Sequence, residues 1–296
     1  MNPLEQAIRE NNLNQLRLLL DLGYDVNEET EDGEPLLHFA IEKDSSLEII
    51  QTLIDHGADI YQENDVGWSL VHIIARKKNP SDIDIDLIKY LVDKGINVAS
   101  KDQWSDTPIA WAVMTNNYRA VEALLDCGAD VNQNVIDGKL YSNDWTFPES
   151  KLGSTNFASL FHILEDFPGK YEEIALLLLD RGATVWDDKY ASNSPLIGAV
   201  FNQALSVVRL MLKKGVNPNA RNYLKDGSNP NYEMGLPIFG AVACKDLRIL
   251  EELILHGANP DLLEPETRIE FDRYQWKIKA SKILGIVTGI RNSKEI

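Results

Sequence analysis

The chain has 296 residues, of which 44% are hydrophobic and 25% are charged, a balance typical of a folded globular protein. It carries 46 acidic residues against 29 Lys and Arg, and the resulting formal net charge of −17 makes nucleic acid and anionic membranes poor partners. No apolar run reaches about 18 residues, so we expect no membrane-spanning helix, and a basic protein is the partner that the charge favours.

Two further features bear on where the protein works. The N-terminal sequence MNPLEQAIRENN is polar and acidic, and it lacks the basic start and apolar core of a signal peptide. The chain has only 2 cysteines, Cys127 and Cys244, which lie far apart in the sequence. We interpret both as small packing residues rather than a disulfide, and we expect a cytoplasmic protein.

One pattern recurs along the chain: an apolar helical stripe that ends in a glycine. It first reads LRLLLDLGYDVN at 16–27, and AVEALLDCGADVN at 120–132 is another copy. A left-handed glycine is well suited to stop a helix at this point. A base period of about 33 residues with insertions is the mark of a stacked repeat array. The turn glycines are Gly23, Gly57, Gly95, Gly128, Gly182, Gly215 and Gly257.

A shorter apolar segment precedes each of these helices except the first. It reads SDTPIAWAV at 105–113, NSPLIGAV at 193–200 and GLPIFGAV at 235–242. Pro108, Pro195 and Pro237 stand where this segment would begin a helix, which is where proline is tolerated. Each repeat is therefore predicted to hold a turn, a first helix, a tight loop, a second helix and a glycine stop.

The two ends of the array differ from its middle, as the ends of a stacked array must. Residues 3–23 predict a helix pair with polar outward positions, which would cap the N-terminal end. Residues 265–296 lose the repeat, and RYQWKIKASKILGIVTGI at 273–290 predicts an amphipathic capping helix. Its apolar face would place Trp276, Ile278, Ile283 and Leu284 against the last repeat.

The combination DTPIAWAV…AVEALLDCGADVN resembles the ankyrin repeat, and the resemblance covers residues 1 to 262. It implies an all-α solenoid of helix pairs with β-hairpin-like finger loops, about six repeats plus caps. We expect a single domain over 1–296, with a cap repeat at 1–31 and a capping helix at 265–296. Six repeats would fill 32–264, with insertions near 133–152 and 220–234. The fourth repeat departs most from the pattern.

The sequence offers no site for catalysis or for a metal. It has no Gly-x-Ser-x-Gly elbow, P-loop, His-Glu-x-x-His or Cys-x-x-Cys motif, and no histidine stands at ligand spacing from a cysteine or a second histidine. His38, His72 and His162 occupy the repeat's histidine position, where the resemblance implies an imidazole that steadies the loops. We therefore expect a non-enzymatic protein without cofactor or metal. The acidic triplet Asp82, Asp84 and Asp86 is expected to extend a loop and supply a helix N-cap.

The resemblance implies that partners bind to the finger tips and to the concave side of the first helices. Exposed aromatic residues beside acids in these places are typical of a binding hot spot. The aromatic residues of the two insertions either join this surface or fold back on the adjacent repeats. The candidate partner-binding residues are Glu31, Asp32, Glu34, Asp65, Trp68, Arg76, Trp104, Asp106, Met114, Trp145, Phe147, Phe167, Tyr190, Asn193, Phe201, Tyr232 and Glu233.

We expect a protein that is monomeric when free and that binds, and inhibits or sequesters, a basic partner protein. A stand-alone array of this size resembles bacterial immunity proteins that neutralise a cognate toxin. The alternative is an effector or scaffold that binds a host protein. A third possibility is an enzyme whose site lies in the insertions.

Overall fold

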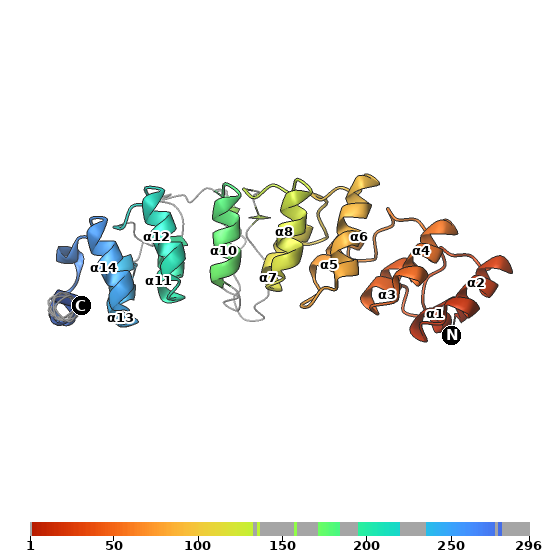
Figure 1. Ribbon diagram of the computed structural model, residues 1–296, viewed down its shortest axis with the longest axis horizontal. Helices are drawn as coiled ribbons and strands as arrows, with labels where there is room; N and C mark the ends of the chain where they lie inside the picture. Colours follow the sequence, from red (N-terminus) through yellow and green to blue (C-terminus); the bar gives the residue numbers. More distant parts are fainter. Residues whose placement is uncertain are drawn as a thin grey trace, which may run out of the picture. The chain divides into compact units, whose positions relative to one another are not determined.

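The structure is a computed structural model that describes residues 2–132, 135–136, 157–158, 171–183, 195–219, 235–275 and 278–279. Over these residues the chain is built from helix pairs that follow one another along the sequence (Figure 1). It divides into two compact units, Met1–Gly182 and Ala183–Ile296. Among the described residues, no helix is long and apolar enough to cross a membrane.

In the first unit each pair joins a shorter first helix to a longer second one. The pairs are α1 (Pro3–Arg9) with α2 (Leu13–Asp21), α3 (Leu36–Glu42) with α4 (Leu47–Asp55), α5 (Leu70–Ala75) with α6 (Asp82–Asp93), and α7 (Pro108–Met114) with α8 (Tyr118–Asp126); α10 (Tyr171–Asp180) packs on α8. First helices pack on first helices throughout the unit, and second helices pack on second helices in the pairs α2 with α4 and α6 with α8, so the unit has two layers. Strands β1 (Val135–Ile136) and β2 (Phe157–Ala158) pair in antiparallel fashion.

The second unit repeats the arrangement with two helix pairs, α11 (Pro195–Phe201) with α12 (Leu205–Lys213) and α13 (Pro237–Ala243) with α14 (Leu247–Leu255). A short 3-10 helix, η2 (Pro260–Leu262), follows, and residues 265–275 are helical again, where the sequence predicts the capping helix. Phe271 and Tyr274 on this last helix are buried. Ile278 is helical, whereas Trp276, Ile283 and Leu284 lie outside the described residues.

The glycine stops that the sequence predicts are confirmed. All the turn glycines from Gly23 to Gly257 have φ between 89° and 98°, a region that residues with a Cβ rarely adopt. After α8, for example, the N–H of Ala129 donates to the carbonyl oxygen of Leu124 at 2.9 Å, which satisfies a carbonyl that the helix leaves unpaired. The apolar residue four positions before the glycine is fully buried in every repeat but the first, as in Leu53, Leu91 and Leu124, whereas Leu19 of the cap is partly exposed.

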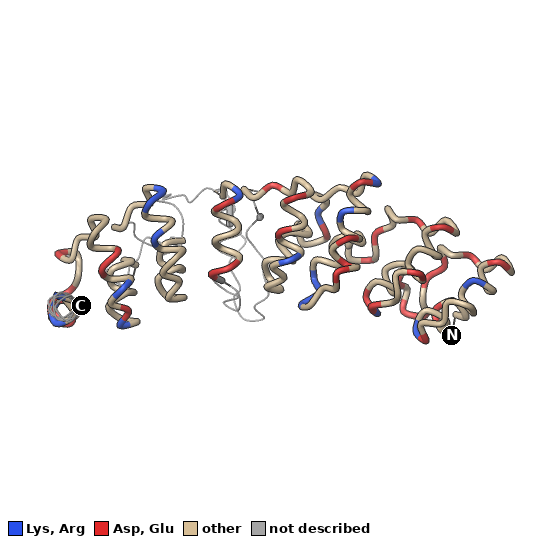
Figure 2. The backbone as a smooth tube through the Cα atoms, in the orientation of Figure 1, with Lys and Arg blue, Asp and Glu red and all other residues tan. Residues whose placement is uncertain are grey.

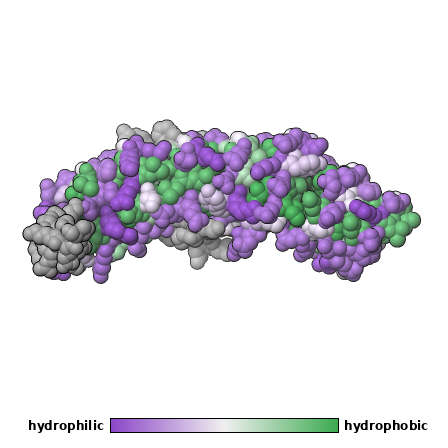
Figure 3. Space-filling model, in the orientation of Figure 1, coloured by the Kyte–Doolittle hydropathy of each residue, from purple (hydrophilic) through white to green (hydrophobic). Residues whose placement is uncertain are grey.

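The outward face of the N-terminal cap is mostly polar, as predicted, with Arg9, Glu10, Asn14, Arg17 and Asp21 exposed, but it also carries two apolar side chains. Leu18 and Leu22 on the second helix of the first pair are 60% and 68% exposed. Leu16 and Leu20 point into the core, and two further residues turn an α-helix by roughly 200°, so Leu18 and Leu22, each two residues after a buried leucine, face solvent. Hydrophobic side chains (green) accordingly lie among hydrophilic ones (purple) at the surface of this unit in Figure 3.

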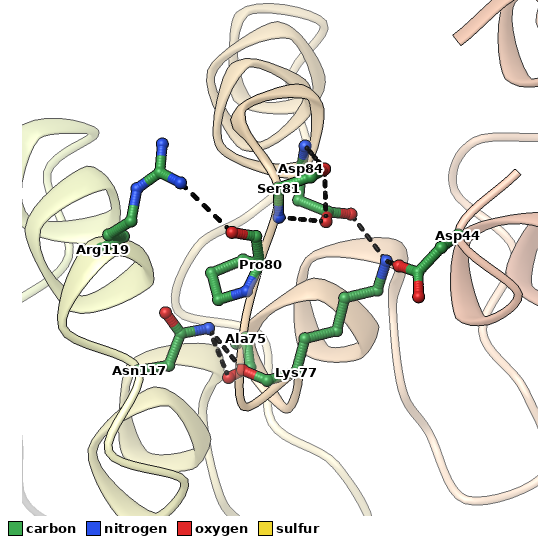
Figure 4. A network of polar contacts seen from close by, with 8 residues as sticks. All are labelled: Asp44, Ala75, Lys77, Pro80, Ser81, Asp84, Asn117 and Arg119. Carbon is green, nitrogen blue, oxygen red and sulfur yellow. Dashed lines mark hydrogen bonds and ion pairs between the residues drawn. The ribbon is translucent and has the colours of Figure 1, made fainter. Parts of the chain in front are cut away.

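A polar network centred on the loop between α5 and α6 joins three consecutive repeats (Figure 4). The Nζ of Lys77 donates to Asp44 Oδ1 and to Asp84 Oδ1, both at 2.7 Å. From the following repeat, the Nδ2 of Asn117 donates to the carbonyl oxygen of Lys77 at 2.8 Å. The N-cap of α6 is Ser81, and Asp84 completes its capping box from inside the helix, so the acidic triplet begins the helix rather than extending the loop.

Candidate functional site

The loops that precede α3, α5 and α7 are fingers of one shape, which we number finger 1 (residues 30–34), finger 2 (64–68) and finger 3 (102–106). In each, the first and last residues pair through their main chains, and the side-chain oxygen of the first accepts the N–H of the last. The side-chain bonds measure 3.0, 2.9 and 3.0 Å for Thr30 with Glu34, Asn64 with Trp68, and Asp102 with Asp106. Thr, Asn and Asp can all make this bond, so different residues build the same turn.

The histidines to which the resemblance assigns loop support bond to the finger of the following repeat. His38 Nε2 lies 3.0 Å from the carbonyl oxygen of Trp68, and His72 Nε2 lies 3.3 Å from that of Asp106. Both rings are fully buried. Burial lowers the pKa of His38, and it lowers the pKa of His72 to about 4, so both rings are neutral near pH 7 and donate from Nε2. Their structural role is confirmed, and His162 lies outside the described residues.

Fingers 2 and 3 lie close enough for their tryptophans to touch. The ring centroids of Trp68 and Trp104 are 5.9 Å apart. Trp111, on the first helix α7, completes a cluster, with its ring centroid 5.7 Å from that of Trp68 and 6.3 Å from that of Trp104. The N–H of Gln103 donates to the carbonyl oxygen of Val66 at 3.0 Å and ties the two fingers together. The two finger indoles are therefore in direct contact within one cluster.

Asp102 lies at the centre of this cluster and is 6% exposed. Its Oδ2 accepts the indole N–H of Trp68 at 3.0 Å and that of Trp111 at 2.8 Å. Its Oδ1 accepts the main-chain N–H groups of Trp104 and Asp106 at 2.9 and 3.0 Å. Four donors thus satisfy a buried carboxylate, which would otherwise be costly to desolvate.

Acidic and basic residues both occur along the backbone of the first unit (Figure 2), and three of them lie near the cluster. The guanidinium carbon of Arg76 lies 3.5 Å from the ring centroid of Trp68, and its Nη1 lies 3.6 Å from Oε1 of Glu42. Glu34 is partly buried in finger 1. Its burial raises the pKa of its carboxyl to about 7, with further contributions from the carboxylates of Glu42 and Asp32.

Of the 17 predicted partner-binding residues, Asp106 and Met114 are buried, and the rest fall into three groups. Glu31, Asp32, Asp65, Trp104 and Phe201 are exposed, with Trp104 at 37% and Phe201 at 45%, while Glu34, Trp68 and Arg76 are partly exposed. The fingers bring Trp68, Trp104 and Arg76 together, whereas Phe201 belongs to the second unit. The others lie outside the described residues: Trp145, Phe147, Phe167, Tyr190, Asn193, Tyr232 and Glu233.

The expectation that Asp106 and Met114 lie at the surface is wrong, because each is 5% exposed. Met114 ends α7, a helix whose residues are all buried. Asp106 closes finger 3, where its main chain is bonded to both Asp102 and His72. Burial, together with the charge of Asp102, raises the pKa of Asp106 to about 6.

Sequence reasoning missed Asp102 and Trp111. Asp102 holds the same finger position as Thr30 and Asn64, so its turn-building role could have been found by aligning the fingers. That its second oxygen would meet two indoles depends on contacts between a finger and a helix, which the spacing does not reveal. In the described part of the chain, no group of three His, Cys, Asp or Glu residues could hold a metal ion.

Comparison with protein families finds ankyrin-repeat models. A model of three ankyrin copies matches residues 1–64 and 37–135, and the single ankyrin-repeat model matches residues 192–223. An ankyrin repeat protein of fowlpox virus (strain NVSL) is 31% identical over 141 residues, 43% of this chain and 20% of its own length. The B-cell lymphoma 3 protein homolog of Mus musculus is 30% identical over 139 residues, 47% of this chain and 27% of its own length.

The chain thus matches about a quarter or less of the length of these curated relatives. Among solved structures, the ankyrin repeat domain of Bcl-3 has a TM-score of 0.60 and 19% sequence identity, covering 86% of this chain and 98% of that one. At this identity the likeness shows the fold. With the family-model matches, it shows that the chain belongs to the ankyrin-repeat family, whose repeats indicate a protein–protein interaction module and are typically non-enzymatic.

Proposed function

We propose that the protein binds and blocks a basic protein partner through the finger surface of its first unit. We define the finger surface by Glu34, Glu42, Trp68, Arg76 and Trp104. The observation that carries the proposal is the exposed ring of Trp104, held in contact with Trp68 beside the carboxylates of the fingers. Rigid indoles at a surface are typical anchors of protein interfaces.

The charge of the chain supports a basic partner. The net charge is −17, and Glu31, Asp32, Glu63 and Asp65 are all exposed on or next to fingers 1 and 2. Such charges steer a basic protein toward the surface and raise its association rate. The indoles would then desolvate against the partner and slow its dissociation.

Blocking is the simplest act for a protein that only binds. An immunity protein that neutralises a basic toxin is one protein of this kind, and we include that role in the proposal. We place the encounter in the cytoplasm, because the two cysteines are free thiols, as suits a reducing compartment. We further propose that the free protein is a monomer.

Panning a phage-displayed peptide library on the full chain tests the proposal with peptides in place of the partner. We expect the selected peptides to be rich in Lys and Arg and to lose affinity for Trp104→Ala, since truncating an anchor costs about 2 kcal/mol or more. Leu255→Ala is the matched control, because Leu255 is 68% exposed but lies in the second unit. Acidic peptides, or peptides that bind Trp104→Ala and wild type equally, would contradict the proposal.

A further inference from the structure

We infer that Asp102 is the positioning residue of the finger surface. Its carboxylate turns the N–H edges of Trp68 and Trp111 inward and fixes the tryptophan cluster as a platform that meets a partner's Lys or Arg side chain by its ring faces. This inference rests on the proposed function for the identity of the partner, whereas the positioning itself rests on the contacts of Asp102.

The two oxygens of Asp102 have different tasks. Oδ1 accepts two main-chain N–H groups of finger 3, as the Oδ1 of Asn64 does in finger 2. An amide therefore suffices to build the turn. Oδ2 accepts both indole N–H groups, a task for which an acceptor without hydrogens is required. The second oxygen of Asp102 is thus not required for the turn, and its role is to hold the two indoles.

The inward-facing indole N–H groups determine which atoms of the rings remain for contact with a partner. Because Trp68 and Trp111 donate their only polar hydrogens to Asp102, neither indole N–H is left for a partner. Trp111 is buried beneath the cluster, and the partly exposed Trp68 therefore offers carbon atoms only. The planes of Trp68 and Trp111 are inclined by 82° and those of Trp104 and Trp111 by 71°. Such edge-to-face contacts hold the rings in a fixed order.

The cluster already shows which group its faces accept. The guanidinium of Arg76 lies over the ring of Trp68 at 3.5 Å, a geometry that the ring quadrupole favours. Trp104 is the most exposed member of the cluster, at 37%. A Lys or Arg of the partner stacked on Trp104 would repeat this contact, and the nearby acids of the fingers match the charge of such a side chain.

The substitution Asp102→Asn separates positioning from folding. Asparagine keeps an oxygen for the main-chain bonds of the finger but replaces Oδ2 by an amide that cannot accept the indole hydrogens. We expect the helical circular dichroism to be retained while the indole N–H resonances of Trp68 and Trp111 shift and exchange faster with solvent. Asp65→Asn, at an exposed acid one finger away, removes the same charge and should leave both resonances in place.

Binding is measured with the peptides selected on the wild-type chain. Asp102→Asn should weaken them roughly three- to tenfold, the range expected when cation–π contacts and a fixed ring geometry are lost. Asp65→Asn should weaken them less, because it removes only charge. Unchanged indole resonances would overturn the inference, and so would shifted resonances with unchanged binding. If the wild type selects no peptide, the proposed function fails, while the indole spectra still decide whether Asp102 positions the rings.

Discussion

At the scale of the residue, Glu34 carries a carboxyl whose pKa lies close to neutrality. Its pKa is raised from 4.5 to about 7, so the folded protein binds more protons than the unfolded chain between these values. Glu34 therefore contributes to the free energy of unfolding in full below pH 4.5, and this contribution is lost as the pH rises toward 7. Asp106, whose pKa is raised from 3.8 to about 6, acts with the same sign over a lower window.

The substitution Glu34→Gln tests this assignment. The variant should be more stable than wild type at pH 8, by about 1 kcal/mol after allowance for solvent screening, and the difference should vanish near pH 4. Urea unfolding at a series of pH values measures it. Glu31→Gln, at an exposed acid of the same finger, is the control. Equal stability of wild type and Glu34→Gln at pH 8 would contradict the raised pKa.

Individual residues also mark the limit of what the sequence can predict. The turn glycines and the buried histidines recur at fixed positions of the repeat, so their roles follow from the period. Asp102 and Trp111 occur once, and their roles arise from the contact of a finger with a helix of its own repeat and with the preceding finger. Asp106 shares its finger position with Glu34 and Trp68, yet of the three it alone is buried. The repeat position therefore does not fix how exposed a finger residue is.

At the scale of the element, each second helix contributes one apolar face to the core that the buried first helices complete. Leu124 on α8 is fully buried, and Leu124→Ala should lower the free energy of unfolding by about 2–5 kcal/mol. Leu18→Ala, at a position of α2 that is 60% exposed, should change it by less than about 0.5 kcal/mol. Chemical denaturation of the two variants compares a core leucine with a surface one, and similar losses would contradict the two-layer packing.

The loop between α5 and α6 provides a second test at this scale. The side chain of Lys77 is 14% exposed and that of its partner Asp84 is 6% exposed, so Lys77→Gln leaves a buried carboxylate without its cation. We expect a loss of about 1–3 kcal/mol in the free energy of unfolding. The neighbouring Lys78 is exposed, and Lys78→Gln should be neutral. A neutral Lys77→Gln would show that the network in Figure 4 adds nothing to stability.

At the scale of the whole molecule, the excess of acids over bases governs encounter rather than fold. Asp32→Lys combined with Asp65→Lys should lower the association rate of a basic peptide, most strongly at low salt, and leave its dissociation rate nearly unchanged. Trp104→Ala should do the reverse and raise the dissociation rate. Stopped-flow binding at two salt concentrations distinguishes the two effects. Charge reversal that acts mainly on dissociation would place these acids inside the interface rather than at its rim.

The direction of the histidine bonds sets the boundaries of a transferable binding unit. His72 belongs to the repeat of finger 2, but the carbonyl it supports belongs to finger 3, which holds Asp102 and Trp104. A graft of finger 3 and α7 alone would leave that support behind, as would an exchange of the preceding repeat for one without the imidazole. The smallest piece that can carry the tryptophan cluster into another scaffold therefore begins with finger 2, which holds Trp68, and ends after α7, which holds Trp111.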